Sequence, residues 1–181
     1  MTLKTFITLL LVGLCALMLE GALATIFPPP WCPDLAFLVV VSVGLCRRGL
    51  IPGLLFAYLL GSSIDVLSGS LMGLHALLSI FAFMAAAFAG SQLNLKSTFS
   101  LMGFVGSLSV VYGLSLYLLS SFFSEGIDLG LVWIIETFVH AAINALAAPF
   151  VVDGISRLVA WSGTDDSQER ALYIESVGKP L

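Results

Sequence analysis

Residues 61–75 read GSSIDVLSGSLMGLH and lie between two long apolar runs, residues 50–60 and 74–89. Gly and Ser punctuate this stretch, which predicts a turn between two helices. The carboxylate of Asp65 and the imidazole of His75 therefore stand at the ends of segments that are otherwise apolar enough to span a membrane. Ionisable groups at such positions are costly and are usually paired, buried in protein or functional. The role of Asp65 and His75 is the main question that the sequence raises.

The composition around this stretch predicts a membrane protein. The chain has 181 residues, of which 59% are hydrophobic and 10% are charged, whereas a soluble domain has about 25% charged residues. The mean hydropathy is +1.09. Since a spanning helix needs about 20 apolar residues, we expect an all-α integral membrane protein with six transmembrane helices. The predicted spans are Leu3–Phe27, Asp34–Cys46, Leu50–Leu67, Leu71–Leu93, Thr98–Phe123 and Leu131–Ala160.

The second predicted span is short, and we expect its neighbours to shield it. Three prolines, residues 28–30, and Pro33 precede it, and proline favours an extended chain there. Residues 1–161 form one predicted membrane domain. Residues 162–181 form a short polar cytoplasmic tail, for which we expect flexibility.

The basic residues predict the orientation of these spans. When the connections are assigned alternately to the two sides of the membrane, all seven Lys and Arg fall on one side, which is typical of the cytoplasm. They are Lys4, Arg47, Arg48, Lys96, Arg157, Arg170 and Lys179. The other side carries only acidic groups: Asp34, Asp65, Glu125 and Asp128. We therefore expect both termini in the cytoplasm. The scattered basic residues do not favour nucleic-acid binding.

Three features of the sequence leave the first span open to a second interpretation. Lys4, the apolar run and Ala22-Leu23-Ala24 are similar to a secretory signal with its cleavage site, and cleavage would leave five spans in the same orientation. Glu20 and the membrane segments that follow favour a retained helix.

The cysteines at positions 15, 32 and 46 lie at different expected depths and form no C-x-x-C motif, so we expect no metal site.

Small residues recur every fourth position in two spans. The third span carries Gly49, Gly53, Ala57 and Gly61, and the fourth carries Ala82, Ala86 and Gly90. Such a ridge lies on one helix face and allows another backbone to approach closely. The ridges have two interpretations: packing within the bundle, which is the more common case, or docking of a transmembrane helix from a partner.

Polar groups of several spans share one expected depth. Glu20, Asp65, His75 and Glu136 all fall in the outer third of the bilayer, and Glu136, His140 and Asn144 repeat every fourth residue. Because charges are costly in lipid, we expect this stripe to face the bundle interior. Hydrogen bonding between helices is the favoured role, a polar ligand pocket comes second and a catalytic site last. His140 and Asn144 have the H-x-x-x-N spacing of one CAAX-type intramembrane protease motif, but the paired glutamates of those enzymes are missing.

Asp65 itself has a specific predicted role. It precedes a turn that contains Gly69 and Gly73, close to the start of the fourth span. An acidic side chain at such a place can accept backbone N–H groups. We expect its carboxylate to bind the N–H groups of Ser68 to Ser70 or to pair with His75.

Two motifs carry a resemblance to a known family. Pro33-Asp34-Leu35 opens the second span, and residues 61–77 contain G-x-x-x-D-x-x-x-G followed by SLMGLHAL. With these motifs, the chain resembles the rod shape-determining MreD proteins of the bacterial cell-elongation machinery. The resemblance covers residues 3–161, is strongest over residues 33–78 and is weak in the last two spans. It implies a multi-pass protein of the bacterial inner membrane.

The resemblance also implies a function without catalysis and without a cofactor. MreD-like proteins bind the bitopic protein MreC and act with MreB, RodA and a penicillin-binding transpeptidase in lateral peptidoglycan synthesis. An acidic outer face with Trp31 and Asp34 would then meet MreC, and membrane lipid would surround the bundle. MreD proteins are also thought to share their architecture with substrate-binding subunits of energy-coupling-factor vitamin transporters. Such a subunit is the alternative, although Ala16 and Glu20 stand where those proteins carry A-x-x-x-A.

Overall fold

The chain folds into a bundle of helices in a computed structural model that describes residues 3–26, 31–46, 49–69, 73–92, 97–123 and 131–177. These residues form α1 (Leu3–Ala24), α2 (Leu35–Leu45), α3 (Leu50–Ser68), α4 (Leu74–Gln92), α5 (Thr98–Phe123) and α6 (Leu131–Val177). Within the described ranges, five helices are long and apolar enough to cross a membrane, and α2 is the shorter apolar helix. The predicted all-helical membrane fold is therefore confirmed.

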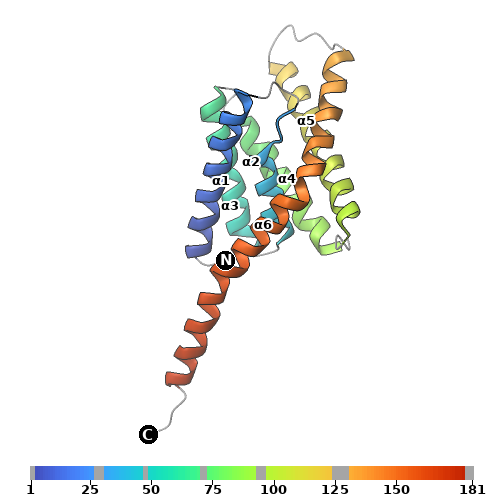
Figure 1. The fold of residues 1–181 in the computed structure, drawn as a ribbon. Coiled ribbons are helices and arrows are strands. Elements are labelled where there is room, and N and C mark those ends of the chain that lie inside the picture. Colours follow the sequence, from blue (N-terminus) through green and yellow to red (C-terminus); the bar gives the residue numbers. More distant parts are fainter. Residues whose placement is uncertain are drawn as a thin grey trace.

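Consecutive helices run in opposite directions along the bundle (Figure 1). We call the end where α3 leads into α4 the Asp65 end, and the end where α2 leads into α3 the Gly49 end. The start of α1 and the projecting part of α6 both lie toward the Gly49 end (Figure 1). Of the basic residues used for the orientation, Arg47, Arg48, Lys96 and Lys179 lie outside the described residues, as do Glu125 and Asp128.

Helix α2 lies at the centre of the bundle. It contacts α1, α3, α4 and α6, and nine of its eleven residues, Ala36 to Gly44, are buried. Its apolar sequence has no polar face, which is what a helix enclosed on all sides requires. At 1.5 Å per residue α2 is about 16 Å long, roughly half of the ~30 Å hydrocarbon core. The short second span is thus shielded as expected, and its first turn begins inside the bundle.

The small-residue ridges pack inside this bundle. A Cβ on Gly61 would lie 2.6 Å from the Cα of Ala76, and a Cβ on Gly53 would enter the ring of Phe83. The α4 ridge faces α2, because Gly90 lies against the carbonyl oxygen of Leu45. The other ridge residues that are fully or almost fully buried are Ala57, Ala82 and Ala86. Packing within the bundle is therefore the correct interpretation for these contacts, while Gly49 begins α3 as its N-cap.

Helix α5 packs against the first part of α6. On α5, a Cβ at Gly106 would lie 3.3 Å from the Cβ of Ala145, and a Cβ at Gly113 would lie 3.1 Å from Thr137. The predicted bounds of α5 are confirmed. The part of α6 that is apolar enough to cross a membrane, Trp133–Trp161, ends one residue from the predicted Ala160, while the helix itself continues to Val177. Residues 178–181 lie outside the described residues, and flexibility of the tail stays a prediction.

Candidate functional site

The segment between α3 and α4 is shaped by two glycines with positive φ. Gly69 ends α3 as a left-handed C-cap with φ 63°, and Gly73, directly before α4, has φ 94°. Side chains with a Cβ are disfavoured in this conformation. Residues 70–72 lie outside the described residues. The two glycines allow α4 to return alongside the last turn of α3.

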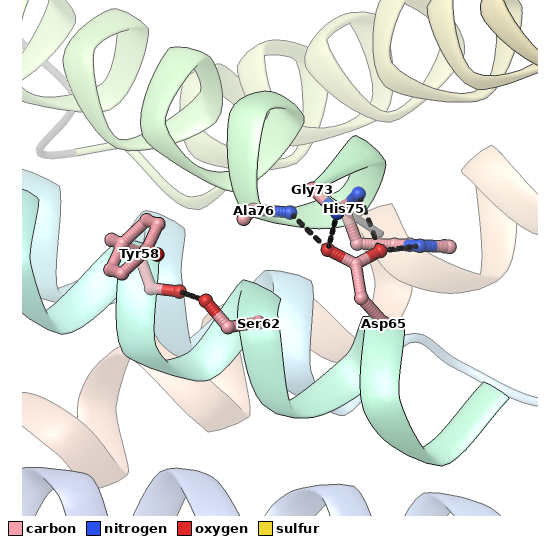
Figure 2. Close-up of polar contacts among 6 residues, drawn as sticks. All are labelled: Tyr58, Ser62, Asp65, Gly73, His75 and Ala76. Atoms are coloured by element: carbon pink, nitrogen blue, oxygen red, sulfur yellow. Dashed lines mark hydrogen bonds and ion pairs between the residues drawn. The ribbon is translucent and has the colours of Figure 1, made fainter. Parts of the chain in front are cut away.

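The carboxylate of Asp65 caps the start of α4 from the last turns of α3 (Figure 2). Its Oδ2 accepts the N–H groups of Gly73 at 3.0 Å and Ala76 at 3.1 Å, and its Oδ1 accepts the N–H of His75 at 2.9 Å. The first N–H groups of a helix have no partner within it, so an acceptor there stabilises it, and a negative charge also suits its dipole. The expected capping role is confirmed, with donors that follow the expected Ser68–Ser70.

The imidazole of His75 completes this cap. Its Nδ1 lies 2.9 Å from Oδ1 of Asp65, which confirms the second expected contact. The Asp65 side chain is 3% exposed and that of His75 is 17% exposed. Asp65 is therefore an enclosed acceptor, whereas His75 covers it from the more exposed side. We call Asp65, Gly69, Gly73 and His75 the α4 cap.

A second polar group surrounds the start of α2. Asp34 is its N-cap, and Oδ1 of Asp34 accepts the N–H of Phe37 at 2.7 Å. Oε2 of Glu20, on α1, accepts the N–H of Ala36 at 3.2 Å. Two carboxylates from different parts of the chain thus serve the free N–H groups of one buried helix end. The carboxylate of Asp34, expected to meet a partner at the outer face, is used within the bundle.

Asn144 ties this helix end to α5 and α6. Its Oδ1 accepts the N–H of Asp34 at 2.8 Å, and its Nδ2 donates to Oγ of Ser109 at 2.9 Å. The Asn144 side chain is 1% exposed, so both bonds are shielded from water and lipid. The sequence indicated Asn144 but not Ser109, because nothing distinguishes this serine from its neighbours on α5. We call Glu20, Asp34, Ser109 and Asn144 the α2 cluster.

The polar stripe predicted along α6 is buried at one end and exposed at the other. Asn144 is buried and His140 is half-buried, but Glu136 is exposed. The expectation that Glu136 faces the interior was therefore wrong. Glu136 lies near the start of α6, close to the Asp65 end, where contact with water or lipid headgroups removes the need for a buried partner.

The segment before α2 combines an exposed aromatic side chain with a buried thiol. Trp31 is 62% exposed and Cys32 is buried. Burial, together with the nearby carboxylates of Glu20 and Asp34, raises the pKa of the Cys32 thiol. The protonated thiol faces the carbonyl oxygens of Glu20 at 4.0 Å and Pro33 at 3.8 Å. These contacts give Cys32 a local packing role and leave Trp31 available at the surface.

Together, the polar side chains act as helix caps and interhelical bridges. Within the described residues, every buried side-chain nitrogen or oxygen has a hydrogen-bond partner, and no group of three or more His, Cys, Asp or Glu could hold a metal ion. Two cavities are lined mainly by apolar residues, one between α1 and α6 and one at the Gly49 end. The chain matches no protein-family model, no curated protein and no solved structure. Proposals about its function therefore rest on its own motifs and contacts.

Proposed function

We propose that this protein is a non-enzymatic scaffold of the MreD type, which binds the bitopic protein MreC in the bacterial inner membrane. In this proposal the Asp65 end faces the periplasm and the Gly49 end faces the cytoplasm. The scaffold acts with RodA, a penicillin-binding transpeptidase and MreB during cell elongation. The six helices packed around the short α2 form a framework to which partner proteins could bind, as this proposal requires.

One observation carries the proposal most directly. Four residues of the stronger of the two motifs contribute to the turn from α3 to α4 or to its cap: Asp65, Gly69, Gly73 and His75. Matching residues that together form one turn and its cap are a more specific similarity than matching residues that lie in unconnected parts of the structure. The α4 cap therefore supports a common local architecture with the MreD family.

The use of the polar groups supports a scaffold rather than a polar ligand site. Asp65, Glu20 and Asn144 each accept backbone N–H groups inside the bundle. A ligand that took these acceptors would leave helix ends without partners, at about 1–3 kcal/mol for each unsatisfied group. A fixed outer end that presents the exposed Trp31 fits the binding of a partner protein better.

The alternative is a substrate-binding subunit of an energy-coupling-factor-type vitamin transporter. In those subunits two alanines on the first span meet the transporter partner. Here the second of those positions is Glu20, whose carboxylate is held by α2. Ala16 does line the groove of about 240 Å³ between α1 and α6, together with Gly154. Recovery of transporter ATPases with the protein would support this alternative.

Affinity purification from native membranes, followed by mass spectrometry, tests the proposal. We expect MreC to be recovered with the full-length protein. Trp31→Ala should reduce that recovery, because aromatic side chains at interfaces contribute strongly to binding. Trp161→Ala is the matched control, since Trp161 is also exposed but lies on the part of α6 toward the other end. Undiminished recovery with Trp31→Ala removes Trp31 from the interface, and absence of MreC from the wild-type sample contradicts the proposed function.

A further inference from the structure

Helix α6 contains a proline between two parts that pack on different neighbours. Its first part runs beside α5, and its next part crosses toward α1 (Figure 1). Pro149 lies in the interior of the helix. Proline has no N–H to donate to the carbonyl oxygen four residues earlier, here that of Ala145, and its ring crowds that turn. Sharp bends in helices are usually centred on such a proline.

The part of α6 before Pro149 is held in place by polar and close apolar contacts. Asn144 accepts the N–H of Asp34 and donates to Oγ of Ser109. One residue later, the Cβ of Ala145 lies 3.3 Å from the place that a Cβ on Gly106 would occupy. These contacts join α6 to α2 and α5 up to about one turn before the proline.

The part of α6 after Pro149 borders an open groove of about 240 Å³, which α1, α2 and α6 line. We call it the Gly154 groove. Because α1 and α6 run in opposite directions (Figure 1), the order of the lining residues along both helices places Ala16 and Gly154 at about the same level. A Cβ on Gly154 would nevertheless meet nothing within 4 Å, whereas a Cβ on Gly61 would lie 2.6 Å from the Cα of Ala76. Gly154 therefore faces a neighbouring helix without touching it.

Two buried residues limit how far this part of α6 can move. Ile155 is 3% exposed and Val159 is 4% exposed, and both belong to a core cluster with residues of α1, α2 and α3. They keep the helix on the bundle, so a movement at Pro149 is a small pivot and not a detachment. The groove provides space for a pivot toward α1, and the small residues Ala16 and Gly154 allow the two backbones to approach closely.

We propose that Pro149 is a hinge, about which the following part of α6 moves between the open groove described above and a closed position with Gly154 against Ala16. The closed position gains close helix packing, and the open one leaves the groove to acyl chains. Since α6 continues from Trp161 to Val177, roughly 24 Å at 1.5 Å per residue, this projecting part moves with the hinge. A change at the groove thus alters the surface at the Gly49 end, whichever partner the scaffold binds.

Double electron–electron resonance in lipid nanodiscs tests the proposal. The full-length protein, with its three cysteines replaced by alanine, carries spin labels at Val111→Cys on α5 and Trp161→Cys beyond the hinge. Both positions are exposed, by 58% and 73%. We expect two distances between the labels in this labelled parent. The longer one belongs to the closed position, because α1 lies on the side of the bundle away from α5 (Figure 1).

Gly154→Leu should remove the longer distance. Its side chain enters open space and leaves the open position undisturbed, but it fills the groove into which α6 would move. Gly103→Leu is the matched control, because a Cβ on Gly103 also meets nothing within 4 Å and Gly103 does not line the groove. Both distances should remain in this control. Pro149→Ala should reduce the two distances to one, because alanine restores the helical N–H and stiffens the turn.

The other outcomes of this measurement overturn the proposal. A single distance in the labelled parent means that α6 does not move. Two distances that persist in Gly154→Leu mean that the movement does not close the groove, and two that persist in Pro149→Ala mean that the hinge lies elsewhere. Equal changes in Gly154→Leu and Gly103→Leu mean that the effect is not specific to the groove. The sample contains no MreC, so failure of this proposal is distinguishable from failure of the proposed function.

Discussion

The α4 cap and the α2 cluster both supply acceptors for N–H groups at the start of a helix, but those acceptors come from very different distances along the chain. In the α4 cap, Asp65 reaches N–H groups that follow it by eight to eleven residues. In the α2 cluster, Glu20 reaches across 16 residues and Asn144 across 110. Both place an acceptor at a helix start that is enclosed by protein, where an unpaired N–H group is costly. The α4 cap joins residues that are close in sequence, whereas the α2 cluster links distant parts of the bundle.

This difference predicts different consequences when each site is damaged. The α4 cap joins two consecutive helices, so its loss should loosen the contact between α3 and α4 first. The α2 cluster connects α1, α2, α5 and α6, so its loss should loosen the bundle as a whole. Variants that remove one acceptor at a time test this comparison.

Asp65→Ala should have the largest effect. It leaves three N–H groups at the start of α4 without their acceptor, and we expect a loss of about 3–5 kcal/mol, given about 1–3 kcal/mol for each unsatisfied group and partial replacement by water. Thermal unfolding of the detergent-solubilised protein measures the loss. Asp153→Ala is the control, because Asp153 forms an exposed ion pair with Arg157. Similar unfolding temperatures for Asp65→Ala and wild type would show that the cap does not stabilise the fold.

The difference between the two sites also determines how much of each was predictable from the sequence. Asp65 and His75 stand near glycines in a short turn, and short-range contacts follow from turn geometry. The capping role and the pairing with His75 were therefore predictable. The donors Gly73 and Ala76 were not, because they depend on the angle at which α4 returns past α3.

The α2 cluster was predictable only in part. Depth along the spans placed Glu20 and Glu136 in one layer, and the spacing of four residues added His140 and Asn144, but depth does not fix the direction in which a side chain points. Hence Glu136 was misplaced and Ser109 was missed. The helices themselves follow from apolar runs because the hydrocarbon core sets their length, whereas the extension of α6 to Val177 crosses a polar sequence that carries no such constraint.

Asn144→Ala should have the next largest effect. The variant loses the acceptor for the N–H of Asp34 and the donor to Ser109, and we expect a loss of about 2–3 kcal/mol. Ser109→Ala removes only one of these bonds and should cost about 1 kcal/mol. Thermal unfolding of both single variants and the double variant measures their coupling. Additive losses would mean that the bond between Asn144 and Ser109 contributes little.

Glu20→Gln should have a smaller effect, because glutamine keeps an oxygen that can accept the N–H of Ala36. The charge at the helix start is lost, for which we expect about 0.5–1.5 kcal/mol. Glu136→Gln is the matched control, since Glu136 is exposed on α6 and should change the unfolding temperature little. Equal effects of the two substitutions would mean that a charge on Glu20 adds nothing to its hydrogen bond with Ala36.

His75→Ala should have the smallest effect and decides what kind of contact closes the α4 cap. Asp65 keeps its three backbone donors in this variant, so the loss of a neutral hydrogen bond should cost only about 0.5–1.5 kcal/mol. Breaking a buried ion pair would instead cost about 3–5 kcal/mol, because the remaining charge loses its compensation. Thermal unfolding of His75→Ala beside Asp65→Ala distinguishes the two cases. Equal losses would make His75 the essential partner of Asp65, whereas a small loss assigns the cap to the backbone of α4.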